Sequence, residues 1–198
     1  MTQTLQFAAP EEAARANFYG LIARLFYSAP DARLIAELRQ ARPIEGEGAL
    51  AAAWREMVDA CASAFPVVLE QEHTDLFVGT GKAEVTPYAS YYLVETGREK
   101  ILVRLRGELA GLGLARRGAS HEPEDHIAAL FDVMRHLIST GSGDAATQQK
   151  GFFERYIEGA YGAFCDATSI SEKSNFYKHV ARFAKTFLDV ESEALKVF

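Results

Sequence analysis

The residue types best suited to chemistry gather in one short stretch of this chain, His121-Glu122-Pro123-Glu124-Asp125-His126. Proline and carboxylates are typical of the first turn of a helix, where proline loses no hydrogen bond and negative charge meets the positive end of the helix dipole. The apolar residues that follow, at 127, 130, 131, 134, 137 and 138, have helical spacing. A helix start accounts for the proline and the carboxylates but not for the two histidines. The sequence therefore predicts a titratable cluster at the N-terminal end of an amphipathic helix.

Metal chemistry would need ligands at fixed helical spacing. The five histidines, His73, His121, His126, His136 and His179, form no HExxH pair. Glu70 and His73 make one ExxH unit, but the di-metal carboxylate bundles that use this unit need a second copy, which the sequence lacks. A metal-dependent helical enzyme that uses the Glu122–His126 cluster remains the alternative hypothesis. Stoichiometric metal in the purified protein would favour it.

Nucleophilic and phosphate chemistry also lack their usual motifs. Ser90 is not in a GxSxG elbow, and neither cysteine has an activating neighbour. The loop at 79–82 is too short for a phosphate-binding loop. Asp125 and His126 point about 100° apart if they are adjacent on a helix, so they do not orient one another as an acid–base pair. The sequence therefore favours a protein that is not an enzyme and carries no cofactor.

Peptide binding fits the remaining polar and aromatic residues better. His73, Leu76 and Phe77 lie at i, i+3 and i+4 on one predicted helix face. The loop that follows continues through Pro87, Tyr88, Ser90 and Tyr91. The simplest interpretation of Leu76 and Phe77 is ordinary core. The functional interpretation is a groove for an apolar peptide, whose basic end would bind the carboxylates of Glu122 and Asp125 through charge-assisted hydrogen bonds.

The elements that must position these residues are helices. Apolar spacing predicts helices over about 10–28, 31–40, 49–65, 66–78, 97–114 and 122–140, and two more around 152–164 and 176–188. Only the short run 91–94 alternates with period two. We therefore expect an all-α fold, a single-domain bundle of roughly nine or ten helices that spans residues 1–198.

The composition sets limits on partners and compartment. The chain has 198 residues, of which 48% are apolar and 24% charged, and a net charge of −6, which argues against nucleic-acid binding. It has no recognisable secretory signal and no stretch of about 18 apolar residues, so we expect a cytoplasmic protein without membrane insertion. The two cysteines, Cys61 and Cys165, are expected to be buried thiols.

Three motifs occur in order along the chain: Asp75-Leu76-Phe77-Val78-Gly79, Pro87-Tyr88-Ala89-Ser90-Tyr91-Tyr92 and Glu122-Pro123-Glu124-Asp125-His126-Ile127. With these motifs in an all-helical chain of this length, the sequence resembles the TorD/DmsD family of cytoplasmic redox-enzyme maturation chaperones. The third motif is the most specific. It matches the family pattern at Glu122, Pro123, Asp125 and His126.

The resemblance implies a helper of a molybdopterin oxidoreductase. Such chaperones bind the twin-arginine signal peptide of the client, and often its apo-form, keep the client ready for its cofactor and delay its export. The family's peptide-binding positions correspond to Leu76, Phe77, Tyr88, Ser90, Pro123, Asp125 and His126. Relatives often carry an aromatic residue where this chain has His73, so client preference is expected to differ.

Two further properties are implied less directly. Some relatives bind guanine nucleotide, and some form a homodimer by exchanging helices, for which the 115–121 linker is a plausible hinge. A purely structural interaction module is the third hypothesis for this chain. Such a module would co-purify with a partner yet show no affinity for peptide.

Overall fold

The predicted apolar stripes lie on helices in the computed structural model, which describes residues 10–79, 82–115, 122–141 and 144–197. In this part of the chain there are ten α-helices and no strand, which confirms the all-α prediction. The α-helices are α1 (Pro10–Tyr27), α2 (Ala32–Arg39), α3 (Ala49–Ala60), α4 (Pro66–His73), α5 (Ser90–Leu93), α6 (Arg98–Gly111), α7 (Ile127–Thr140), α8 (Ala145–Tyr156), α9 (Glu158–Ile170) and α10 (Tyr177–Leu195). A 3₁₀ turn, η1 (Cys61–Ser63), follows α3, and a π-helical turn, η2 (Thr74–Val78), follows α4.

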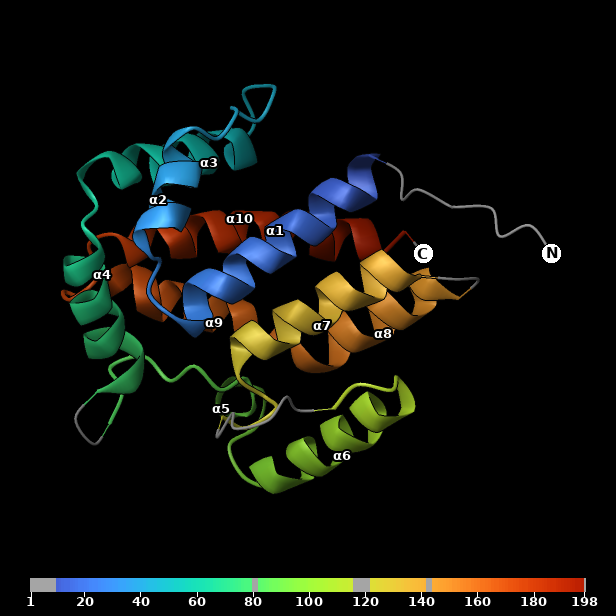
Figure 1. Ribbon diagram of the computed structural model, residues 1–198. Coiled ribbons are helices and arrows are strands. Elements are labelled where there is room, and N and C mark those ends of the chain that lie inside the picture. Colours follow the sequence, from blue (N-terminus) through green and yellow to red (C-terminus); the bar gives the residue numbers. More distant parts are fainter. Residues whose placement is uncertain (1–9, 80–81, 116–121, 142–143, 198) are drawn as a thin grey trace.

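The core forms around three helix pairings. α1 packs most extensively against α7, while α10 packs against α9 and α3 (Figure 1). Buried aromatic rings join these layers: Phe26 of α1 meets Phe164 of α9 edge to face at 4.9 Å and Phe131 of α7 at 6.4 Å. Such contacts contribute beyond the burial of area alone. The buried apolar cluster extends from Ala16 to Leu195, so almost the whole described chain contributes to one core.

α6 lies apart from these layers, at the edge of the molecule (Figure 1). One of its residues, Leu105, is fully buried, whereas Val103 is 66% exposed. Glu108 connects α6 to α8, since it pairs with Arg155 and accepts a hydrogen bond from the hydroxyl of Tyr156 at 2.8 Å.

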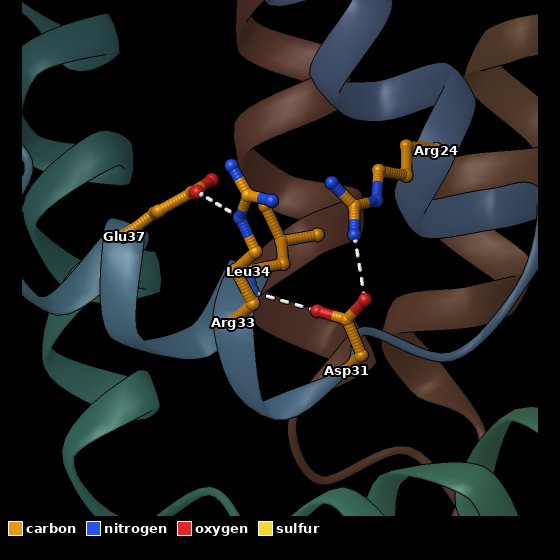
Figure 2. Close-up of polar contacts among 5 residues, drawn as sticks. All are labelled: Arg24, Asp31, Arg33, Leu34 and Glu37. Carbon is orange, nitrogen blue, oxygen red and sulfur yellow. Dashed lines mark hydrogen bonds and ion pairs between the residues drawn. The ribbon is translucent and has the colours of Figure 1, made fainter.

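The short helix α2 begins as the sequence predicts. Asp31 is its N-cap, with Oδ1 accepting the N–H of Leu34 at 2.7 Å, which satisfies one of the unpaired donors of the first turn (Figure 2). Its Oδ2 accepts a hydrogen bond from Arg24 of α1 at 2.9 Å, so the cap also connects the two helices. Arg33 and Glu37 form a separate exposed pair one turn apart.

Several predicted boundaries were wrong. The third helix ends at Ala60 rather than near Phe65. It continues as the 3₁₀ turn η1 to Ser63, and the chain is then extended at Ala64 and at Phe65, where the following Pro66 disfavours helical backbone. The helix predicted around 152–164 is two helices, α8 and α9, which meet at Ile157. The alternating run 91–94 belongs largely to the short helix α5.

The helix predicted to start at the carboxylate cluster starts after it. α7 begins at Ile127 with His126 as its N-cap, and residues 122–125 form a turn ahead of it. Pro123 is therefore not in the first helical turn. His121 and residues 116–120 of the predicted hinge lie outside the described residues.

Candidate functional site

Two of the predicted motifs are joined by backbone pairing. The N–H of Ala89 donates to the carbonyl of Asp125 at 2.8 Å, and the N–H of Ile127 donates to the carbonyl of Pro87 at 2.8 Å. Tyr88 and His126 thus form an isolated antiparallel bridge. This pairing holds His126 in an extended conformation (φ −57°, ψ 127°), which explains why α7 cannot start earlier. The side chains of the two motifs consequently lie next to each other.

A pocket of about 300 Å³ opens beside this bridge. Five of the nine predicted site residues line it: His73, Phe77, Tyr88, Glu122 and His126. The other lining residues are Tyr27, Val78 and Pro87. Tyr27 was not among the residues predicted from the sequence. It is the last residue of α1, lies off the apolar stripe of that helix and is 54% exposed.

Glu122 is the only carboxylate among the described residues that line this pocket. Its Oε2 accepts a hydrogen bond from the hydroxyl of Tyr88 at 2.7 Å, which holds the carboxylate in place. Burial, together with this hydrogen bond, raises the pKa of Tyr88 to about 12. Tyr88 is therefore a neutral donor at physiological pH, and Glu122 presents its remaining acceptor positions to the pocket.

His126 has two functions in this geometry. Its Nδ1 accepts the N–H of Ala128 at 3.2 Å, as an N-cap does. Its ring contacts Tyr27 and Tyr88 edge to face, with centroids 6.0 and 5.8 Å away. The side chain is almost buried, and this burial lowers its pKa, although Glu122 and Asp125 act in the opposite direction.

His73 is the second imidazole of the pocket. Its Nε2 lies 3.3 Å from the carbonyl oxygen of Phe26, which can only accept, so Nε2 carries the proton. Burial lowers the pKa of His73 as well. Both histidines are consequently neutral at pH 7, and the charge of the pocket lining is the single negative charge of Glu122.

Asp125 and Ser90 are buried beside the pocket rather than in its lining. Asp125 is 2% exposed, and its Oδ2 accepts the backbone N–H of Ser90 at 3.2 Å. This bond connects the start of α5 to the turn before α7. The carboxylate therefore stabilises the frame that presents Glu122 and His126.

Leu76 and Phe77 divide between core and pocket. Leu76 is fully buried, and its carbonyl accepts the N–H of Val85. Phe77 lines the pocket and is also packed against Phe26 and Tyr177, at 5.9 and 5.2 Å. The π-helical turn η2 presents these two residues. The turn ends at Val78. Gly79 follows it with a positive φ of 65°, and the nearby carbonyl of Lys82 leaves no room for a Cβ atom there.

A second, larger hollow of about 870 Å³ lies between α1, the C-terminal end of α6 and α7. Pro123, the remaining predicted residue, lines this hollow and not the smaller pocket. Tyr27, Glu122 and His126 line both. No sequence pattern predicted this hollow, because the residues that line it come largely from three helices distant in the chain.

The described residues offer little for other chemistry. They contain no group of three or more His, Cys, Asp and Glu side chains placed to hold a metal ion. Cys61 and Cys165 are buried free thiols, and burial raises the pKa of Cys61 to about 11. Within the same residues, no helix combines the length and the hydropathy needed to cross a membrane.

Comparison with known proteins places this chain in a family. The family model described as nitrate reductase delta subunit matches residues 45–166, which is more than half of the chain. The match includes η2, the segment around Tyr88 and the start of α7. A solved structure with the same fold is that of a protein from Archaeoglobus fulgidus described as a redox enzyme maturation protein. The two share 19% identity with a TM-score of 0.59, over 95% of this chain and 99% of the other.

Two curated relatives carry the name chaperone protein TorD. The protein from Shewanella loihica is 27% identical over 204 residues, which cover 94% of this chain and 95% of the relative. The protein from Colwellia psychrerythraea is 26% identical over 230 residues, which cover 98% and 96%. These names confirm the expectation of a chaperone rather than an enzyme. The chain belongs to the nitrate reductase delta subunit family and is a TorD-like chaperone.

Proposed function

We propose that this chaperone binds the twin-arginine signal peptide of a molybdopterin oxidoreductase in the cytoplasm. The observation that carries the proposal is the single carboxylate of Glu122, held by Tyr88 in a pocket whose two histidines are neutral. A pocket that has one negative charge and is lined by aromatic side chains favours the binding of one cationic group.

Arginine suits this pocket better than lysine does. Among the described residues, Tyr88 is the only hydrogen-bond partner of Glu122, and it occupies Oε2. A guanidinium can donate to the remaining acceptor positions and lie against the rings of Tyr27, Tyr88 and Phe77. The ammonium group of lysine is more strongly hydrated and has no planar face for stacking.

We further propose that the chaperone binds the apo-form of the client, assists cofactor insertion and delays export until the cofactor is bound. The names of the relatives and of the solved structure support an oxidoreductase client. To test this step, the client is produced with and without the chaperone, and its molybdopterin content is measured. Equal cofactor content in both preparations would contradict a role in insertion.

Calorimetric titration with a peptide that carries Ser-Arg-Arg before an apolar run tests the binding step. We expect micromolar or tighter affinity, about −8 kcal/mol, and weaker binding of the Lys-Lys version. Glu122→Gln should weaken the Arg-Arg peptide by about tenfold or more, because hydrogen bonds to charged groups contribute about 1.5–3 kcal/mol.

Glu154→Gln is the matched control, since it changes the net charge equally from an exposed position on α8. It should leave affinity unchanged. If neither peptide binds to the wild-type chain, the signal-peptide assignment is wrong. If Glu122→Gln and Glu154→Gln bind alike, Glu122 is not the arginine acceptor.

A further inference from the structure

Four successive apolar residues at the start of α4 are exposed: Phe65, Pro66, Val67 and Val68. The exposed fractions of Phe65, Val67 and Val68 are 66%, 77% and 56%. The other large apolar residues that are exposed in the described part of the chain are single in the sequence. Single exposed apolar residues are ordinary, whereas a consecutive run of three or four is unfavourable for solubility unless it has a function.

Local stability does not explain this run. Phe65 is the N-cap of α4 and its side chain makes no capping hydrogen bond, although serine or asparagine there would satisfy an unpaired N–H of the first turn. Val67 and Val68 are β-branched residues on the exposed side of a helix, where they lower helix propensity without gaining buried contacts. The fold would therefore be at least as stable with polar residues at these positions.

The run is held rigidly from both sides. Arg39 of α2 donates to three backbone carbonyls of the segment 61–64 at 2.8–3.2 Å, which fixes the chain just before Phe65. One turn after Val68, the buried carboxylate of Glu72 accepts three backbone N–H groups at the start of α10. A surface that is already ordered loses little conformational entropy when a partner binds to it.

The charges beside the run are negative. Glu70 lies three residues after Val67 and therefore on the same exposed face of α4. Asp75 accepts a hydrogen bond from Gln71 at 2.8 Å. Neither carboxylate forms an ion pair with another described residue, and residues 60–69 contain no basic side chain. Charge complementarity therefore favours a partner that has basic side chains beside an apolar patch.

The position of the run favours a folded partner. α4 lies at the edge of the molecule (Figure 1), and Phe65, Val67 and Val68 line neither the smaller pocket nor the larger hollow. A folded surface can cover several exposed side chains of a helix at once. A second copy of this chain fits less well, because it would bring the same unpaired carboxylates and a net charge of −6.

We propose that the exposed run 65–68, together with Glu70 and Asp75, is a docking surface for the folded body of the client, the part outside its signal peptide. The client would present an apolar patch flanked by lysine or arginine. This inference rests on the proposed function, in which the chaperone binds the apo-form of the client. It assigns that binding to a surface separate from the pocket of Glu122, so either contact can be lost without the other.

The probe is the oxidoreductase whose cofactor content the chaperone raises, produced without its signal peptide and without molybdopterin. Biolayer interferometry measures its affinity for the chaperone. Val67→Ser combined with Val68→Ser should weaken this binding by about tenfold or more, because truncation of central interface residues commonly has an effect of this size. The Ser-Arg-Arg peptide should bind the double variant as it binds the wild type. Val103→Ser, at an exposed valine of α6, is the matched control and should leave both affinities unchanged.

Phe65→Ser should raise stability while it weakens binding. The backbone at residue 65 already has the extended conformation of an N-cap (φ −118°, ψ 129°), so serine can cap α4 without a change of backbone. We expect the midpoint of thermal unfolding to rise by about 2–4 °C and the affinity for the leaderless client to fall by about fivefold or more. A lower midpoint would show that the phenylalanine supports the fold and would contradict its assignment to docking.

Glu70→Lys tests the charge of the partner. It should weaken binding of the leaderless client by about tenfold or more at low salt and reduce the dependence of affinity on salt. Glu154→Lys, at an exposed position of α8, changes the net charge equally and should have little effect. Tighter binding by the Glu70→Lys variant would show that the partner is not basic.

Three further outcomes would overturn the inference. If the leaderless client does not bind the wild type, or binds the double serine variant equally well, the docking surface is wrong, while binding of the Arg-Arg peptide would still support the signal-peptide site. If the peptide also fails to bind and no oxidoreductase gains cofactor, the proposed function itself fails. A wild-type dimer in sedimentation that the double serine variant abolishes would assign the surface to a second copy of the chain.

Discussion

Asp125 and His126 are neighbours in the chain, but the structure gives them different surroundings. His126 lines both cavities, whereas Asp125 is buried and bonded to the backbone of Ser90. From the sequence, both were candidates to bind a basic peptide directly. Because Asp125 is buried and accepts the backbone N–H of Ser90, it stabilises the fold in addition to the binding role expected from the sequence.

Substitution of Asp125 should therefore change stability. Asp125→Ala leaves the N–H of Ser90 without its acceptor and should lower the free energy of unfolding by about 1–3 kcal/mol. Asp125→Asn keeps an acceptor oxygen and should lower the free energy of unfolding by a smaller amount. Urea denaturation measures both. An Asp125→Ala variant as stable as the wild type would show that this bond contributes little and would return Asp125 to a role in recognition.

At the scale of elements, α4, which carries His73, is attached to the start of α10 by the side chain of Glu72. The sequence did not indicate this contact. Glu72 on α4 is 7% exposed, and its Oε1 accepts the backbone N–H groups of Asn175, Phe176 and Tyr177 at 2.7–2.8 Å. These are unpaired donors at the start of α10. A side chain of one helix therefore caps another and fixes α4 on the core.

Loss of the cap made by Glu72 should destabilise the folded protein. Glu72→Ala should lower the free energy of unfolding by about 2–3 kcal/mol, because three buried N–H groups lose a charged acceptor. Glu72→Gln should be milder, since its amide oxygen still accepts. Glu70→Ala, at an exposed position of the same helix, is the control and should change little. Equal unfolding free energies for the Glu72→Ala and Glu70→Ala variants would contradict the cap.

At the scale of the whole molecule, buried histidines make stability depend on pH. Burial is the largest cause of a lowered pKa at His73, His126 and His179; at His179 the neighbouring Lys178 and Arg182 lower it further. In the unfolded chain these groups return to about 6.5. Between the folded and unfolded pKa values, the unfolded state binds more protons, so stability rises with pH.

We therefore expect the free energy of unfolding to fall as the pH decreases below about 6.5. Urea denaturation at pH 7.5 and 5.5 measures the change. A variant with His73→Asn and His126→Asn should show a smaller difference between the two pH values, whatever its absolute stability. Peptide affinity should fall over the same range, because two protonated imidazoles repel arginine beside Glu122. A double variant with the wild-type pH difference would exclude these histidines as its source.

The fold class and much of the helix pattern could be predicted because they depend on local spacing. Leu21 and Leu25, for example, share one helix face because they are only four residues apart. The start of α7 could not be predicted, because it depends on pairing between His126 and Tyr88, which is a contact between distant segments. The burial of Asp125 and the cap made by Glu72 depend on distant contacts as well.

The sequence by itself determined an all-helical chain with three family motifs in order, since helical periodicity and motif order are properties of neighbouring residues. Only the tertiary structure decided which motif residues line a cavity. Tyr88 and Glu122 meet although they are 34 residues apart, and α1, α6 and α7 enclose a second hollow that no motif marks. Long-range packing sets the direction of each side chain, and this direction separates the half-buried Glu122, which lines both cavities, from the buried Asp125.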